Sequence, residues 1–454
     1  MKKSLLTLLL LIFAFMLSAG TPKYVFLMIG DGMGPGTVQM YNKLFPDNNL
    51  KKFAAPVLTG TDNVFGKTTD SAASGTALAC GIKTYNRSIA MDKDGKPVTS
   101  LAKLLKKRQW KIGIVSSVGI NDATPATHYA NRKTRNEYAG IISDIGRPGF
   151  DFFGVSLIKG NAKAGMAQLK KVLSSSQYQI VNGKNMNKLK PENKNAVITG
   201  TNVPQLKPGS VRLCDITTKA AELLSAGDNC FFLMVEGGAV DHGNHANDAS
   251  WAMKEMIEFD AAIGAALNFA AKHPEDTLII VTADHDTGGL TLKDPSKLDS
   301  KFYLKQKAFL AGLTSVAVKL KAAKLPADQI IKQLTRQVGI ENITADEQKK
   351  LNYACSLFLD GKTTSTDKFT AGMGYGRYNP LVIEVLRTRD RRNGFYYTSF
   401  GHTNAKVTTF VKGPGSEHFK APLENSDIPH RIAAAAGMPE LLKKEGKAAA
   451  KSAR

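Results

Sequence analysis

Cysteine is scarce in this sequence, and closely spaced cysteine pairs are absent. The four cysteines, Cys80, Cys214, Cys230 and Cys355, are spread over 454 residues without a C-x-x-C pattern. Zinc ribbons and thioredoxin-type redox motifs need such pairs, so both are excluded. Cys80 and Cys230 lie in apolar runs and suit buried thiols. The spacing indicates no particular disulfide, although an oxidising compartment would permit one or two.

The sequence also lacks an apolar run long enough for a comfortable membrane span, which needs about 18 residues. Near the N-terminus, Met1-Lys2-Lys3 precedes an apolar stretch from Leu5 to Leu17, which Ser18-Ala19-Gly20 follows. A basic start, a short apolar stretch and small residues are typical of a secretory signal peptide. We therefore predict that residues 1–20 direct export to the periplasm or the extracellular space. An N-terminal anchor is the alternative.

Acidic residues are outnumbered by basic ones. The formal net charge is +22, and it falls to +20 without Lys2 and Lys3. Such a balance suggests anionic partners: phosphorylated substrates, nucleic acid or acidic lipid. The cations are interleaved with acids and are densest in 184–194 and 443–454, which favours a solvated surface. Because no nucleic-acid module or aromatic-interleaved basic stripe is found, a nucleic-acid-binding protein is the less favoured alternative.

Continuous apolar runs that end in glycine or acidic residues alternate with helical patterns. The runs are Tyr24–Ile29, Ile112–Val115, Cys230–Val235 and Thr277–Thr282, and the helical patterns include Ser100–Lys107, Ile216–Ala226 and Ala246–Ala271. This alternation predicts an α/β fold with a doubly wound, mostly parallel central sheet flanked by helices. Ligands bind beyond the carboxyl ends of such strands, so acids at several strand ends are expected to converge on one site.

One catalytic domain is predicted over residues 21–438. Within it, 293–392 is less regular and contains the helical patterns Ser315–Ala323 and Ala327–Val338. We interpret this segment as a cap inserted into the sheet domain. A late strand is expected at Thr408–Val411 and a final helix at Asp427–Gly437, followed by a basic, flexible tail over 439–454.

Potential metal ligands follow the ends of the predicted strands. They are Asp31, Glu236, Asp241, His245, Asp284, His285 and His402. Carboxylate and imidazole ligands suit zinc, whereas carboxylate, hydroxyl and water suit magnesium. Each residue alone is as compatible with a helix cap or an ordinary histidine. Several at one edge of a sheet together indicate a metal centre.

A polar turn, Thr68-Thr69-Asp70-Ser71, leads into small residues and a short apolar helix. Asp70 or Ser71 could be an ordinary N-cap. Alternatively, Ser71 lies at a helix N-terminus, where backbone N–H groups favour an incoming anion. A serine hydroxyl is a weak nucleophile and no histidine is near it in sequence, but a metal ion can stabilise its alkoxide. Ser71 is therefore a candidate nucleophile.

At these residues the chain resembles the alkaline phosphatase family. The matching motifs, in chain order, are Gly30-Asp31-Gly32-Met33-Gly34, Thr69-Asp70-Ser71-Ala72-Ala73, Asp122-Ala123-Thr124-Pro125, Val235-Glu236-Gly237, Asp241-His242-x-x-His245, Thr282-Ala283-Asp284-His285 and Gly401-His402-Thr403. The resemblance covers residues 24–437. It implies an enzyme that hydrolyses small phosphate monoesters to an alcohol and inorganic phosphate through a phosphoserine. It also implies two zinc ions, one magnesium ion and, as in many family members, a homodimer.

The resemblance also assigns roles to residues. The first zinc, which binds the leaving-group oxygen, would be held by Asp241, His245 and His402. The second, which activates Ser71, would be held by Asp284, His285 and Asp31. Magnesium would be held by Asp31, Thr124 and Glu236, with Asp122 and His242 flanking it. Because family members vary at these flanking positions, zinc or cobalt is an alternative third metal.

Arg135 falls where the family has its phosphate-binding arginine, although Lys133 or Arg132 could share the phosphate. A phosphodiesterase or sulfatase on the same two-zinc frame is the alternative function. The pair of Glu236 and Thr124 argues against it, because it creates a third metal site. A sulfatase would also need a C/S-x-P-x-R motif, which the sequence around Ser71 does not have.

Overall fold

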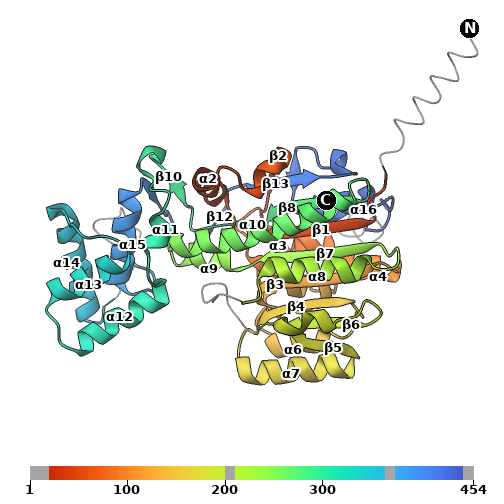
Figure 1. Ribbon diagram of the computed structural model, residues 1–454, viewed down its shortest axis with the longest axis horizontal. Coiled ribbons are helices and arrows are strands. Elements are labelled where there is room, and N and C mark those ends of the chain that lie inside the picture. The colour runs from red at the N-terminus through yellow and green to blue at the C-terminus, as the bar shows by residue number, and fades with distance from the viewer. Residues whose placement is uncertain (1–19, 200–209, 363–373, 443–454) are drawn as a thin grey trace, which may run out of the picture.

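A ten-stranded sheet runs through the molecule in the computed structural model, which describes residues 20–199, 210–362 and 374–442. The strand order is β14-β2-β13-β8-β1-β7-β3-β4-β6-β5 (Figure 1). The strands are β1 (Tyr24–Gly30), β2 (Ala54–Gly60), β3 (Lys111–Gly119), β4 (Phe152–Leu157), β5 (Tyr178–Asn182), β6 (Lys194–Ile198), β7 (Phe231–Gly237), β8 (Thr277–Ala283), β13 (Val407–Lys412) and β14 (Leu423–Glu424). The four apolar runs of the sequence are the central strands β1, β3, β7 and β8, as predicted.

All neighbouring strands are parallel except at β13, which is antiparallel to both β2 and β8. Residues of β1, β7 and β8 are buried along their whole length, because helices cover both faces of the sheet. One face carries α2 (Pro35–Leu44), α8 (Leu213–Ser225) and α10 (Ala249–Lys272). The other carries α3 (Ser71–Cys80), α4 (Leu101–Lys107), α5 (Ala123–Tyr129), α6 (Tyr138–Asp144), α7 (Ala162–Ser175) and α16 (Asp427–Ala435). The doubly wound α/β prediction is confirmed.

The region after β7 differs from the expectation of a helix that starts at Ala246. A separate helix, α9 (Ala239–His245), comes first, and α10 begins only at Ala249. Asn247 has a φ of 49°, which breaks the helix, and the Asp248 carboxylate caps α10 by accepting the Trp251 N–H. Two predicted zinc ligands, Asp241 and His245, therefore belong to their own short helix.

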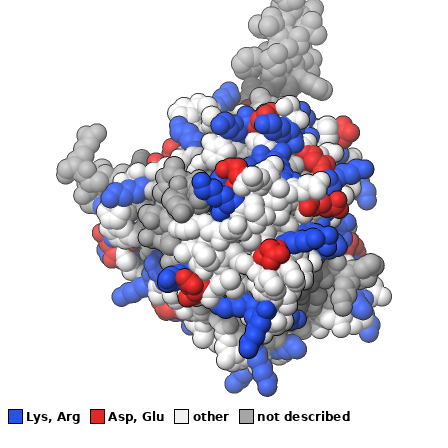
Figure 2. Space-filling model, turned by 90° about the vertical axis from the view of Figure 1, so that its left-hand side faces the viewer, with Lys and Arg blue, Asp and Glu red and all other residues white. Residues whose placement is uncertain are grey.

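The described residues of the segment 293–392, which are 293–362 and 374–392, form a helical lobe beside the sheet, at the left of Figure 1. It contains α11 (Phe302–Lys305), α12 (Leu310–Ala322), α13 (Ala327–Gln337), α14 (Ala345–Leu359) and α15 (Pro380–Arg392). The apolar residues of α12 to α15 form a cluster of their own, whereas Phe302 and Tyr303 of α11 pack into the cluster on the α10 face of the sheet. On the face in Figure 2, which looks onto this side of the molecule, Lys and Arg are scattered among acidic and uncharged residues.

Two further predictions concern the chain termini. The predicted signal peptide lies outside the described residues except for Gly20, and 443–454 of the predicted tail also lies outside them. The start of the tail is described, and its Leu442 packs into the apolar cluster on the α3 face. No described helix has both the length and the apolar character needed to cross a membrane.

Candidate active site

The carboxyl ends of three central strands bring acidic side chains together. Gly30 of β1 lies opposite Gly237 of β7 and Ala283 of β8, so the next residues on β1 and β8, Asp31 and Asp284, leave the sheet side by side. Glu236 lies one position earlier on β7. All three carboxylates are buried. The sheet register therefore produces the convergence of acids that the sequence predicted.

Gly32 makes the sharp turn after Asp31 possible. Its φ is 66°, and its N–H donates to Asp284 Oδ1 at 3.0 Å. A Cβ at this position would lie 2.8 Å from the Cα of Asp241. Glycine supplies both the left-handed backbone and the missing volume, which lets α9 approach the end of β1.

Ser71 is the first residue of α3. Asp70 is the N-cap, and its carboxylate accepts the Ala73 N–H at 3.0 Å. The hydroxyl of Ser71 is therefore not used as a cap. Ser71 Oγ lies 3.2 Å from His285 Nε2, and the side chain is 3% exposed. Tertiary contacts thus supply the imidazole neighbour that is missing near Ser71 in sequence.

Two groups of side chains have the composition and spacing of metal sites. Within each group one ligand atom per residue lies within 4.8 Å of the others: Asp31, Asp284 and His285 in one, and Asp241, His285 and His402 in the other. His245 joins the second group, with Nε2 3.1 Å from His402 Nε2 and 3.4 Å from Asp241 Oδ1. The structure therefore brings together the residues predicted for both zinc ions, with His285 between the two groups.

The orientation of the imidazoles is set by acceptors outside the cluster. His245 Nδ1 lies 2.5 Å from the Phe400 carbonyl oxygen, and His402 Nδ1 lies 2.8 Å from that of Thr69. A carbonyl oxygen only accepts, so each Nδ1 carries a proton, and in the neutral ring the lone pair is then on Nε2. Two lone pairs that face each other at 3.1 Å repel unless a cation lies between them. This arrangement fits a metal ion.

Several buried oxygen atoms in the cluster have no hydrogen-bond partner among the described residues. They are Asp31 Oδ1, Thr124 Oγ1, Glu236 Oε1 and Asp284 Oδ2. The first three belong to the residues predicted to hold magnesium, which prefers oxygen ligands. Buried acceptors without partners are costly in a folded protein, and bound cations would satisfy them.

The electrostatics of the cluster favour cations as well. Burial raises the pKa of Glu236 to about 8 and that of Asp284 to about 7. Burial and the neighbouring Asp284 hold the pKa of Asp31 well above its usual range. Carboxylates this close repel one another when ionised. Divalent cations would stabilise their ionised forms, so the residues present fit two zinc sites and a third, oxygen-rich site.

Arg135 lies at the edge of the cluster, held between two carboxylates. Its Nη1 is 3.2 Å from Asp70 Oδ2 and its Nη2 is 3.1 Å from Asp122 Oδ1. Of the other two cations in this loop, Arg132 pairs with the buried Asp144 at 2.9 Å, and Lys133 is exposed. Arg135 is thus the cation of this loop that contacts Asp70, the residue before Ser71, whereas Arg132 contacts Asp144 and the Gly140 carbonyl of α6.

Lys159, which follows β4, is a site residue that sequence reasoning missed. Its Nζ lies 3.0 Å from Asp122 Oδ2 and 3.4 Å from His242 Nε2. Asn121 holds its main chain, with Oδ1 accepting the Lys159 N–H at 2.8 Å and Nδ2 donating to the Lys159 carbonyl at 3.2 Å. Arg135 and Lys159 thus hold the two oxygens of Asp122. No motif marks Lys159, so the sequence offered no signal for it.

Comparisons with known proteins agree with this geometry. A family model described as alkaline phosphatase matches residues 22–149 and 158–438. Alkaline phosphatase 4 of Bacillus subtilis (strain 168) is 30% identical over 432 residues, which cover 89% of this chain and 86% of that protein. The crystal structure of a cold-active alkaline phosphatase from a psychrophilic Shewanella sp. superposes with a TM-score of 0.73 at 27% identity, covering 91% of this chain and 99% of that one. A mutant of TAB5 alkaline phosphatase with magnesium bound in its M3 site has a TM-score of 0.64 at 26% identity, covering 92% and 99%.

Proposed function

The chain belongs to the alkaline phosphatase family and is a phosphatase, and from that premise we propose that it hydrolyses phosphate monoesters through a phosphoserine on Ser71. The proposed cofactors are two zinc ions and one magnesium ion. Asp241, His245 and His402 would hold the first zinc, and Asp31, Asp284 and His285 the second. Asp31, Thr124 and Glu236 would hold magnesium. Magnesium bound in the M3 site of a mutant of the TAB5 enzyme supports this choice of third metal.

The observation that carries the proposal is the position of Ser71 Oγ, 3.2 Å from the Nε2 of His285, a residue shared by both groups of zinc ligands. A metal held by His285 would therefore be close to the hydroxyl. When bound, such an ion supplies Lewis acidity that makes a serine hydroxyl nucleophilic and neutralises a phosphoryl group.

The other residues bind and orient the phosphoryl group. The guanidinium of Arg135 presents a planar fork beside Ser71, which suits two phosphate oxygens at once. Asp70 and Asp122 each hold one terminal nitrogen of that fork, so little side-chain entropy is lost when the phosphate binds. We include Lys159 in this group because it fixes Asp122. Lys133, exposed on the same loop, is proposed to attract the anionic substrate.

The choice between a monoesterase and a diesterase rests on the third site. Thr124 Oγ1 and Glu236 Oε1 are buried without partners among the described residues, which supports a cation there and hence the monoesterase.

Export from the cytoplasm and a homodimer stay predictions. The scattered cations on the face in Figure 2 give no support to the nucleic-acid-binding alternative.

The test is a comparison of wild type and Ser71→Ala after metal analysis of both proteins. We expect wild type with two zinc ions and one magnesium to turn over phosphate monoesters much faster than diesters. Ser71→Ala should lose at least about a thousandfold in turnover with the same metal content. Trapping wild type with labelled substrate at low pH should leave the label on the peptide that contains Ser71.

Full activity of a metal-loaded Ser71→Ala protein would refute the serine intermediate. A preference for diesters would instead show that the third site has been misinterpreted. Activity of zinc-free wild type would contradict the proposal that two zinc ions are the cofactors.

A further inference from the structure

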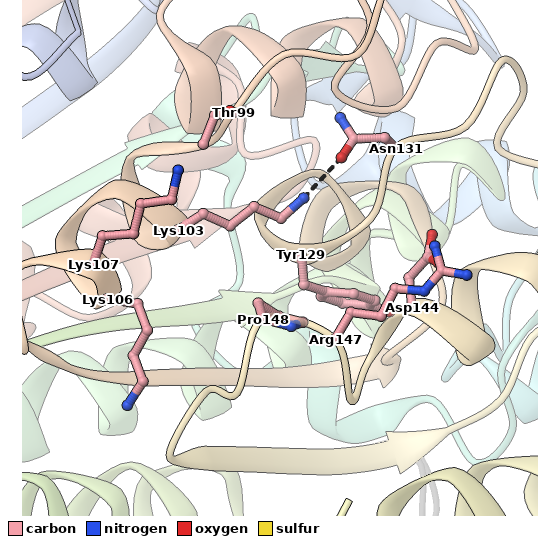
Figure 3. A pocket seen from close by; sticks show the side chains of 9 residues that line it. All are labelled: Thr99, Lys103, Lys106, Lys107, Tyr129, Asn131, Asp144, Arg147 and Pro148. Atoms are coloured by element: carbon pink, nitrogen blue, oxygen red, sulfur yellow. Dashed lines mark hydrogen bonds and ion pairs between the residues drawn. The ribbon is translucent and has the colours of Figure 1, made fainter.

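A basic pocket of about 520 Å³ lies on the α3 face of the sheet, between α4 and the α6–β4 loop (Figure 3). It is separate from the candidate active site. Lys106, which lines it, pairs with Asp151, and Asp151 accepts the N–H of Ile112 at the amino end of β3. The active-site residues follow the opposite, carboxyl end of that strand. None of the residues assigned above to metals or to substrate phosphate lines this pocket.

The charges around the pocket do not balance. Lys103, Lys106, Lys107 and Arg147 line it, together with one acid, Asp144. Asp144 is already shared between Arg132 at 2.9 Å and Arg147 at 2.7 Å. Asp151, outside the lining, is shared between Lys106 at 2.6 Å and Lys111 at 3.3 Å. Within the described part of the chain, Lys103 and Lys107 have no carboxylate partner.

Lys103 is held in place by a neutral acceptor. Its Nζ donates to Asn131 Oδ1 at 2.8 Å, the contact drawn in Figure 3. The side-chain amide of Asn131 is fixed against a flip, because its Nδ2 donates to the carbonyl oxygens of Ala90 and Val98 at 2.6 and 2.9 Å. The side chain of Lys103 is therefore preorganised at the pocket. Burial lowers the pKa of Lys103, because removal from water disfavours the charged ammonium form.

These observations define what the pocket can bind. A half-buried cation without an anionic partner is costly, and a bound anion would remove that cost. Lys103 and Lys107 lie four residues apart on α4, so they share one side of the helix. Arg147 adds a planar fork at the rim; it is 71% exposed and shares Asp144 with Arg132, so its charge is only partly neutralised. The volume exceeds what a single phosphate ion needs.

We propose that this pocket is a second, non-catalytic anion site that binds a diphosphate group through Lys103, Lys107 and Arg147. The diphosphate can be free or part of a larger molecule such as a nucleoside diphosphate. Two unpaired lysines and one arginine match the charge of such a group. Binding there does not depend on Ser71 or on the metals, so the site is independent of the proposed function.

The test is calorimetric titration of the metal-loaded protein with methylenediphosphonate, which phosphatases do not hydrolyse, in buffer that contains magnesium. Wild type should bind one equivalent more than the Lys103→Met/Lys107→Met double variant. The control is Lys111→Met. Lys111 also pairs with Asp151 but does not line the pocket, so this variant should bind like wild type. The extra equivalent should persist after zinc is removed and should weaken at least tenfold between low and high salt.

Thermal melting of each variant shows whether it is folded. If the double variant does not fold, Lys107→Glu replaces it, because Lys107 is exposed and the substitution reverses one of the two unpaired charges. Equal numbers of equivalents and affinities within twofold in wild type and variant would overturn the proposal. Loss of the extra equivalent on zinc removal would also overturn it. Tighter binding of a non-hydrolysable nucleoside diphosphate analogue that is lost in the double variant would support a diphosphate that is part of a larger molecule.

Discussion

At the scale of single residues, the candidate site depends on side chains that are held by hydrogen bonds to groups outside the metal cluster. Thr287 Oγ1 donates to Asp241 Oδ1 at 2.6 Å and lies 3.2 Å from His285 Nδ1. Carbonyl oxygens hold the Nδ1 atoms of His245 and His402. Such outer contacts fix the ligand atom of each residue and raise metal affinity. The site is preorganised before any ion or substrate binds.

The stability of the metal-free protein should fall as the pH rises. The pKa of Glu236 is raised to about 8 and that of Asp284 to about 7, so the folded state holds more protons than the unfolded state between about pH 4 and 8. Folding is then favoured below this window, and the advantage is lost as the pH rises through it. With a chelator, the melting temperature should fall by roughly 5 °C or more from pH 6 to 9.

Two comparisons separate this effect from general alkaline instability. Zinc and magnesium should abolish most of the fall, because cations stabilise the ionised carboxylates. Glu236→Gln without metal should also show a smaller fall. An equal fall in the metal-loaded protein would contradict the prediction.

Lys159 is expected to act on phosphate affinity rather than on the chemical step. In Lys159→Met, the second oxygen of Asp122 loses its partner, so Asp122 holds Arg135 less well and one positive charge is lost near the phosphate. We expect KM and the inhibition constant of inorganic phosphate to rise by about tenfold, equivalent to about 1.4 kcal/mol, with kcat within about twofold.

Lys159→Arg is the matched control, because it keeps the charge and should stay close to wild type. A Lys159→Met protein in which kcat falls while KM is unchanged would show that Lys159 does not act through the phosphate-binding residues.

At the scale of elements, short turns bring the site together. α9 exists because the chain breaks at Asn247 and restarts at the cap Asp248. It carries Asp241 and His245 at a four-residue spacing, which places both on one side of the helix. The turn at Gly32 then lets α9 pack against the end of β1. Neither element is long, and both are positioned by tertiary contacts.

Gly32→Ala should disrupt the metal cluster. A Cβ at Gly32 would meet the Cα of Asp241 at 2.8 Å and the Thr287 hydroxyl at 2.8 Å, in a left-handed conformation. We expect zinc content to fall, with at least tenfold lower phosphatase activity.

Gly95→Ala provides the control for backbone strain alone. Gly95 has a φ of 72° with nothing within 4 Å of the added Cβ. It should cost only about 1–2 kcal/mol in stability, with normal zinc content. Similar zinc content in the two variants would exclude the proposed steric role of Gly32.

At the scale of the whole molecule, the helical lobe and the sheet domain are joined by a buried polar network. Arg389 of α15 is 2% exposed. It lies 2.6 Å from Asp390 Oδ1 and 3.7 Å from Oδ1 of Asp248, the N-cap of α10. It also donates to Ser250 of α10 at 2.9 Å. The lobe is therefore tied to the helix that follows Asp241 and His245, the residues of α9 that are proposed to hold zinc.

Arg389→Met should destabilise the protein strongly. It would leave the carboxylates of Asp248 and Asp390 buried without their cation, which costs about 3–5 kcal/mol. Urea unfolding followed by tryptophan fluorescence measures this, since Trp251 lies near the junction on α10.

Arg392→Met is the control on the same helix, because Arg392 pairs with Glu347 at a more exposed position and should cost about 1 kcal/mol or less. Equal costs for the two variants would mean that the buried network does not stabilise the junction.

The sequence by itself determined the architecture and most of the candidate site. Continuous apolar runs predicted β1, β3, β7 and β8, because strands buried on both faces need apolar residues throughout. The acids and histidines that follow these runs were then expected at one edge, since parallel strands all end on the same side. The ordered motifs indicated the alkaline phosphatase family, and the comparisons with known proteins show that the chain belongs to it.

Tertiary structure alone decided how the side chains are held. The proton positions on His245 and His402 depend on carbonyl oxygens more than 150 residues away in the chain. The preference for Arg135 over Arg132 arises because Arg135 contacts Asp70, the residue before Ser71, whereas Arg132 contacts Asp144 of α6. Lys159 meets Asp122 only because β3 and β4 are neighbours in the sheet. Sequence patterns report local periodicity and order, whereas these choices depend on contacts between distant segments that exist only in the folded chain.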